Sequence, residues 1–229
     1  MSPALMQRLE TAASRMLAWF ERDPFGRRLL RGEVTRAEYA GFLAQSYHYV
    51  RWTMPLLESA GAQLRASRPA LAEAFLVKAR EEDGHERWIL RDLRALGLSA
   101  AEVAASAPSR GVEAYVAWNR MIAESPQAIG LLGTAYVLEV ASDRVAGKIA
   151  GGLVERSRIP GVSGAVRFLR GHAAADPGHV AELNVILERE VRPEDEEIVG
   201  LTGELTALSY LDLAGAPGAA AATPRAEGV

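Results

Sequence analysis

The sequence predicts an all-α protein, a single compact bundle of about seven to nine helices. Apolar residues recur at helical spacing from one end of the chain to the other, and no segment alternates as a half-buried strand does. Helix start and stop signals fall where this spacing predicts them. The 229 residues, 49% of them hydrophobic, suffice for one large core. We therefore expect one helical domain over residues 1–213.

Proline, glycine and capping residues divide the first half of the chain. Pro24 ends the first helix because proline lacks the amide hydrogen needed to continue it. Thr35 and Glu38 form a capping box, Pro55 predicts a kink, and Gly97 is a typical C-terminal cap. The expected elements are a helix over residues 3–22, a short turn over 25–31, and helices over 35–66 and 67–97.

The second half follows the same logic. Pro126 opens a long apolar helix, and Asp176-Pro177-Gly178 interrupts the helical pattern late in the chain. Residues 214–229 are rich in Ala, Gly and Pro and are expected to form a disordered tail. The expected elements are a short capped helix after residue 99, a helix through 115–121, and helices over 126–156, 162–175, 179–191 and 193–213.

Composition excludes several function classes. The net charge of -3 provides no basic surface for nucleic acid. The absence of cysteine excludes thiolate nucleophiles, zinc fingers and iron–sulfur clusters, so any bound metal must take nitrogen and oxygen ligands. No signal peptide or membrane-spanning run is visible, and we expect a cytoplasmic protein that does not bind membranes.

Glu139 is the first candidate functional residue. It lies in a helix that is apolar nearly all the way around, from Ile129 to Ala141. A buried carboxylate requires a partner, which can be an arginine of a neighbouring helix, a proton or a bound cation.

The second pattern is His172-Ala-Ala-Ala-Asp176-Pro-Gly-His179. If the helix continues through it, positions i, i+4 and i+7 share one face, and two imidazoles and a carboxylate converge as metal ligands would. If the helix breaks, Asp176 is instead the cap of a new helix.

The third pattern is Glu81-Glu82-Asp83-Gly84-His85. Either glutamate lies about one helical turn before His85, as in the Glu-x-x-His element of di-iron carboxylate bundles. A solvated acidic face is the competing interpretation.

In this order and at these intervals, the three patterns resemble the haem-oxygenase-like di-iron oxidases. This superfamily includes a chlamydial protein associating with death domains, an undecene-forming fatty-acid decarboxylase and several amino-acid-modifying oxygenases. The likeness spans about residues 35–191, and its most specific part is the His172, Asp176 and His179 array. The resemblance implies a haem-oxygenase-like, thiaminase II-like helical bundle.

The resemblance also implies a non-haem di-metal site. One branch of the superfamily takes a carboxylate ligand from two turns before the first histidine, where this sequence has Lys78. Glu82 is expected to serve instead, with Glu81 as the alternative. Lys78 would repel a cation, but it could hold a substrate carboxylate. The implied ligands are Glu82, His85, Glu139, His172, Asp176 and His179.

Further candidates have no motif behind them. His48 and Glu58 could add ligands, although a structural or substrate-facing role competes. The aromatic residues that could line a substrate pocket, or simply pack in the core, are Tyr47, Tyr49, Trp52 and Tyr136. The basic residues that could anchor a substrate carboxylate, or simply face solvent, are Arg51, Lys78 and Arg144.

The implied cofactors are two iron ions, with manganese as an alternative in one position, and O2 is the implied cosubstrate. Mixed histidine and carboxylate ligands leave open positions at which O2 can be activated for attack on a C–H or N–H bond. The expected partners are a small-molecule substrate, with preference for an amino acid or similar carboxylate, an external electron donor and a second copy of the chain in a homodimer.

Three alternatives remain. A metal-free enzyme of the same fold, like thiaminase II or pyrroloquinoline-quinone synthase, would need a nucleophile or proton shuttles, and the thiaminase cysteine is absent. Haem oxygenase requires an early axial histidine, and no histidine precedes His48. A non-catalytic helical binding protein would leave Glu139 and the paired histidines without a purpose.

Overall fold

The computed structural model describes the backbone of residues 1–214 and the side chains of residues 1–210 other than 176 and 177. Within this part the chain forms eleven α-helices, three short 3-10 helices and no strand, which confirms the all-α prediction. The expected disordered tail lies outside the described residues, apart from Ala214, which closes the last helix.

The helices exceed the predicted number because several long expected segments are divided. In chain order they are α1 (Pro3–Arg22), α2 (Pro24–Arg31), α3 (Arg36–Val50), α4 (Thr53–Leu64), α5 (Pro69–Glu82), α6 (His85–Ala95), α7 (Ala100–Ala105), α8 (Arg110–Ala123), η1 (Ala128–Gly130), α9 (Leu131–Arg156), η2 (Val162–Gly164), α10 (Arg167–Glu190), η3 (Pro193–Asp195) and α11 (Glu196–Ala214).

Two corrections concern the N-terminal third. The expected turn over residues 25–31 is the helix α2, because the Asp23 carboxylate accepts hydrogen bonds from the amides of Phe25 and Gly26, both 2.9 Å long, and so caps a new helix. The expected kink is a local interruption at Arg51 and Trp52, between α3 and α4, where both residues keep right-handed helical backbone angles. Pro55 cannot donate a hydrogen bond to the carbonyl of Arg51, and α3 therefore ends at Val50.

A further break separates α5 from α6, within the segment expected to be one helix. Gly84 adopts a left-handed conformation with φ of 89°, which a continuous right-handed helix excludes. The break places the last residue of α5, Glu82, and the first residue of α6, His85, on either side of a tight turn.

The helix α10 is continuous where an interruption was expected. Its backbone stays helical through Asp176 and Pro177, so residues 172, 176 and 179 lie on one face. Leu169 before this stretch and Leu183 after it are both buried in the core. This packing outweighs the single backbone hydrogen bond that Pro177 cannot donate.

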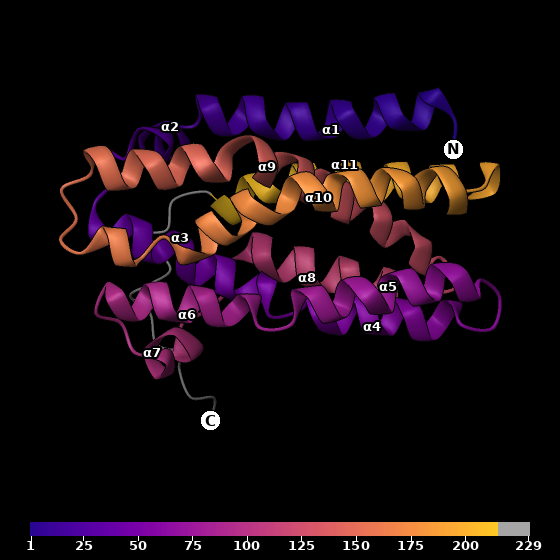
Figure 1. Cartoon of the computed structure of the whole chain (residues 1–229), viewed down its shortest axis with the longest axis horizontal. Coiled ribbons are helices and arrows are strands. Elements are labelled where there is room, and N and C mark those ends of the chain that lie inside the picture. Colours follow the sequence, from indigo (N-terminus) through magenta and orange to yellow (C-terminus); the bar gives the residue numbers. More distant parts are fainter. Residues whose placement is uncertain (215–229) are drawn as a thin grey trace.

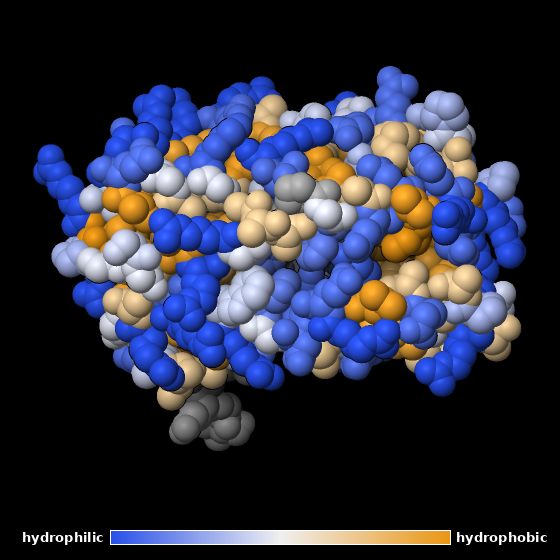
Figure 2. Space-filling model, in the orientation of Figure 1, coloured by the Kyte–Doolittle hydropathy of each residue, from blue (hydrophilic) through white to orange (hydrophobic). Residues whose placement is uncertain are grey.

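Figure 1 shows α1 along one side of the bundle, α4, α5 and α6 along the other, and α9, α10 and α11 between them. The long helix α9 packs against α10, α11, α1 and α2. The molecular face in Figure 2 is largely hydrophilic, with apolar residues in separate small patches. No helix in the described part of the chain is long and apolar enough to cross a membrane.

Two large apolar clusters fill the interior, one toward each end of the bundle, and Val112 and Tyr115 form a third, small one. Both large clusters take residues from α9 and α10: Val137 and Leu183 belong to the first cluster, and Ala146 and Phe168 to the second. The stretches of α9 and α10 between these residues carry the polar candidates Glu139, His172 and His179. The candidate site therefore lies at the boundary between the two halves of the core.

Candidate metal centre

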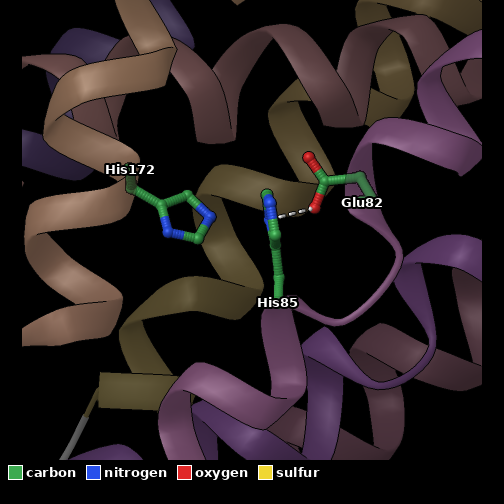
Figure 3. A group of neighbouring side chains, drawn as sticks. All are labelled: Glu82, His85 and His172. Carbon is green, nitrogen blue, oxygen red and sulfur yellow. Dashed lines mark ion pairs between the residues drawn. The ribbon is translucent and has the colours of Figure 1, made fainter.

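The first group of potential ligands is Glu82, His85 and His172. One nitrogen or oxygen atom of each lies within 4.8 Å of those of the other two. His85 Nδ1 is 2.9 Å from Glu82 Oε2, and the two side chains are only 7% and 9% exposed. Figure 3 shows the His85 ring between the Glu82 carboxylate and the His172 ring, so that three elements direct their polar atoms into one space.

Packing holds the His85 ring in this position. The Trp88 ring stacks on it, with centroids 4.1 Å apart and an interplanar angle of 26°. Trp88 in turn packs against α10 at Gly171, where a Cβ atom would lie 2.4 Å from a carbon of the indole. A glycine next to His172 thus permits the close approach of α6 to α10.

His172 has a defined tautomer. Its Nδ1 lies 3.0 Å from the carbonyl oxygen of Phe168, one turn earlier in α10. Because a carbonyl only accepts, Nδ1 carries the proton and Nε2 keeps its lone pair. Burial also lowers the pKa of His172, which favours the neutral imidazole that a metal requires.

The second group is Glu82, Glu139 and His179, again with one atom of each within 4.8 Å of the others. His179 Nδ1 is 3.3 Å from Glu139 Oε1. The hydrogen bond to Glu139 raises the pKa of His179, although burial opposes this shift. Within the described part of the chain, Glu139 is therefore paired with a histidine and not with an arginine of a neighbouring helix.

Glu82 belongs to both groups. Its burial alone would raise the pKa of its carboxyl group, but the hydrogen bond to His85 and the potential of three nearby histidines lower it overall. Glu82 is therefore an anionic group placed between two sets of donors. We call Glu82, His85, Glu139, His172 and His179 the ligand cluster.

The donor set fits iron or manganese. Three imidazoles and two carboxylates converge in a largely buried space, and such a mixture of nitrogen and oxygen ligands suits these metals in helical bundles. The expected ligand Asp176 lies on the same face of α10 as His172 and His179, and its side chain is outside the described part of the chain.

Lys78 lies beside the ligand cluster. It is 7% exposed, and its Nζ atom is 3.0 Å from Glu81 Oε2 and 3.7 Å from Glu182 Oε2. Glu81, the alternative ligand, is thus engaged by Lys78, and it is absent from both groups of close ligand atoms among the described residues.

The two additional ligand candidates lie elsewhere. His48 Nε2 forms a 2.8 Å hydrogen bond with the hydroxyl of Ser106, which gives this histidine a structural role between α3 and α7. Glu58 is exposed on α4. Neither residue is part of the groups of close ligand atoms found in the described chain.

A cavity of about 170 Å³ adjoins the ligand cluster, and its lining includes Lys78 and Tyr49 as expected. The described lining does not include Trp52, Tyr136 or Arg144. Instead, the Tyr136 hydroxyl donates a 2.7 Å hydrogen bond to Glu10, and Arg144 donates one of 2.9 Å to the same carboxylate.

Tyr47 and Arg51, which were also candidates for a substrate pocket, contact each other instead. The Arg51 guanidinium lies over the ring of Tyr47, 5.6 Å from its centroid, and 6.0 Å from the centroid of Trp52. The positive charge of Arg51 therefore interacts with these aromatic rings, and Arg51 is not among the described residues that line the cavity.

Two contributors to the site were not predicted. Asp92 accepts hydrogen bonds from the backbone amides of Arg167 and Phe168 and so fixes the start of α10 against α6. Its signal was position alone: Asp92 stands on the same helical face as the apolar Ile89 and Leu93, in a helix that is otherwise rich in charged residues. Tyr115 lines the cavity and is close enough to Glu82 for the carboxylate to raise its pKa further, beyond the effects of burial and Tyr49.

Solved structures of three proteins share this fold. A domain of unknown function with a haem-oxygenase-like fold from Shewanella denitrificans is 23% identical, with a TM-score of 0.79 over 91% of this chain and 90% of that chain. A TenA homologue from Pseudomonas syringae is 13% identical, with a TM-score of 0.72 over 92% and 91%. Haem oxygenase-1 from Synechocystis, in complex with haem, is 15% identical, with a TM-score of 0.64 over 92% and 90%. These likenesses establish a haem-oxygenase and TenA-like fold.

Sequence comparison identifies the family. No curated protein matches this chain. The model of a family described as iron-containing redox enzyme matches residues 40–203, which is more than half of the chain and includes the whole ligand cluster. The chain therefore belongs to the iron-containing redox enzyme family.

Proposed function

We propose that this protein is a non-haem di-metal oxidase that uses O2 to oxidise a small organic substrate. The observation that carries this proposal is the position of Glu82 in two groups of close metal-ligand atoms. A carboxylate shared between two donor sets is suited to bridge two ions. Membership of the iron-containing redox enzyme family supports iron as the metal.

Glu82, His85 and His172 would hold one ion, and Glu82, Glu139 and His179 would hold the other, with Asp176 as a further proposed ligand on the same face of α10. Two iron ions, or one iron and one manganese, would supply the electrons with which O2 is activated.

The protein itself positions the ligands and limits access of water. Trp88 fixes the His85 ring, and the carbonyl of Phe168 orients His172 so that Nε2 faces the site. The apolar clusters on both sides of the ligand cluster keep bulk solvent from the reacting substrate.

Anaerobic titration with ferrous iron, followed by O2, tests this function. We expect about two irons per chain, as in other carboxylate-bridged bundles, and an O2-dependent change in the optical and Mössbauer spectra. The matched pair of variants is Glu82→Ala, which should lose iron, and Glu81→Ala, which should keep it. Iron retention by Glu82→Ala, or no iron uptake by folded wild-type protein, would contradict the proposal.

A further inference from the structure

The cavity beside the ligand cluster is long. Among the residues of α9 that line it, a row on one face of the helix extends through five turns and consists of Leu131, Ala135, Leu138, Ser142, Val145 and Ile149. From Leu131 to Ile149 the helix rises by about 27 Å at 1.5 Å per residue. Glu139 lies near the middle of this stretch, so the cavity extends past the ligand cluster in both directions.

The walls on both sides are largely apolar. Toward the first core cluster the lining includes Leu71 and Phe75, and toward the second it includes Phe42 and Phe168. Asn119 and Thr134 are among the polar residues of the lining, and both have partners within the protein. Thr134 donates a 2.8 Å hydrogen bond to Asn119 Oδ1, and the Asn119 amide donates one of 2.9 Å to the carbonyl of Tyr115.

Charge is concentrated at the centre. Lys78 is the only lysine or arginine in the described lining, and it approaches the cavity from α5, one turn before Glu82. The side chains of its two acidic partners, Glu81 and Glu182, are 35% and 57% exposed. Water can therefore solvate these carboxylates if Lys78 binds the anionic group of a ligand instead. A buried amino group next to a long apolar wall matches an anionic head joined to an aliphatic chain.

We propose that the substrate class is a long unbranched aliphatic carboxylic acid, with its carboxylate at Lys78 and its chain in the cavity. This inference rests on the proposed oxidase function and narrows its substrate. An amino acid, which the sequence favoured, would leave most of the apolar wall in contact with water.

The position of Lys78 also sets the direction of the chain. Lys78 contacts Glu182 on the side of α10 that leads to Leu183 and the first core cluster. A chain that runs from Lys78 toward the second cluster passes the ligand cluster with its first carbons. Its far end then lies near Ala146 and Phe42, which line the cavity in that half of the core.

Calorimetric titration of the full chain with octanoate, dodecanoate and hexadecanoate, below their micelle concentrations, tests the ligand class. We expect dodecanoate to bind more tightly than dodecanol, and arginine not to bind. Lys78→Met should weaken dodecanoate binding by roughly tenfold to a hundredfold, the range for a lost charged hydrogen bond, and remove the preference over dodecanol. Lys148→Met, at the other lysine of the chain, which is exposed on α9, is the matched control and should bind as the wild type does.

Two space-filling variants test the direction. Ala146→Phe should abolish hexadecanoate binding and keep octanoate binding, whereas Ala135→Phe, in the opposite half of the cavity, should keep both; circular dichroism verifies that both variants fold. Loss of hexadecanoate binding in Ala135→Phe alone would overturn the direction, and equal binding of dodecanoate by Lys78→Met and wild type would overturn the anchor.

The oxidase function and the substrate class can be tested independently, because binding of the aliphatic acid is measured without any enzymatic turnover. Protein that takes up about two irons and binds no aliphatic acid would overturn the substrate class alone. Protein that binds dodecanoate through Lys78 and takes up no iron would overturn the oxidase function and leave the ligand class in place.

Discussion

The carboxylate of Asp92 accepts a 2.8 Å hydrogen bond from the backbone amide of Phe168 and a 3.0 Å hydrogen bond from that of Arg167. Asp92 is fully buried on α6, and the two amides belong to the first turn of α10. The helix that begins with His85 is thereby tied to the helix that carries His172.

Asp92→Ala should therefore destabilise the protein and loosen the ligand cluster. Loss of a helix cap costs about 0.5–2 kcal/mol, and buried amides left without an acceptor add to this cost. We expect a lower midpoint in urea unfolding and weaker iron binding in the same variant. Asp83→Ala, at an exposed acidic residue two positions before His85, is the control, and equal effects of both substitutions would refute the link.

Iron stoichiometry should distinguish the shared ligand from the others. His179→Ala removes a residue of the second group only, and we expect it to retain about one iron. Glu82→Ala removes a residue of both groups and should retain none. Metal analysis after desalting measures both, and the same residual iron in the two variants would exclude a shared role of Glu82.

Two glycine-to-alanine substitutions should have opposite effects on stability. Gly84 has φ of 89°, and alanine there would cost about 1–2 kcal/mol. Gly151 lies within α9, and a Cβ at that position would meet no atom within 4 Å. Gly151→Ala should stabilise the helix by roughly 0.5–1 kcal/mol. Thermal unfolding measures both changes, and destabilisation by Gly151→Ala would contradict the described packing.

Glu10 predicts a pH-dependent contribution to stability. The hydrogen bond from Tyr136 lowers its pKa from the ordinary value of 4.5, burial opposes the shift, and Arg144 adds to it. Since the folded state binds the proton less readily than the unfolded state, the contribution is present above the unfolded pKa and is lost as the pH falls through the lowered folded pKa.

The test compares wild type with Glu10→Gln across pH. At neutral pH the melting temperature of the variant should be lower, and the difference should shrink below the ordinary glutamate pKa and vanish below the lowered folded pKa. Glu58→Gln, at an exposed glutamate of α4, serves as the control. A difference between wild type and Glu10→Gln that stays constant with pH would contradict the assignment.

Local spacing was sufficient to predict an all-α chain and most of its helical segments, but it predicted a turn at residues 25–31 and an interruption at 176–178 where the structure has helix. His172 and His179 are seven residues apart on one continuous helix, so their common face follows from helical geometry. Glu139 was conspicuous because its helix is otherwise apolar. Both conclusions depend only on residues that are close to one another in the sequence.

The remaining features depend on contacts between distant residues. Whether Gly84 continues a helix or interrupts it depends on how α6 packs against α3 and α10, which spacing does not encode. Tyr136 and Arg144 were assigned to a substrate pocket because aromatic and basic residues suit one. Their partner, Glu10, is 126 and 134 positions away in the sequence, beyond the range of any local pattern.

The long cavity has a consequence for how stable this protein can be. Where a tightly packed core would place leucine, α9 presents Ala135, Ala141 and Ala146 to open space, and contacts forgone around a cavity of this size are worth on the order of a few kcal/mol. Larger side chains at these positions would therefore raise the melting temperature of the protein and leave less room for a ligand. The alanines of α9 therefore lower the stability of the folded protein and leave space in which a ligand can bind.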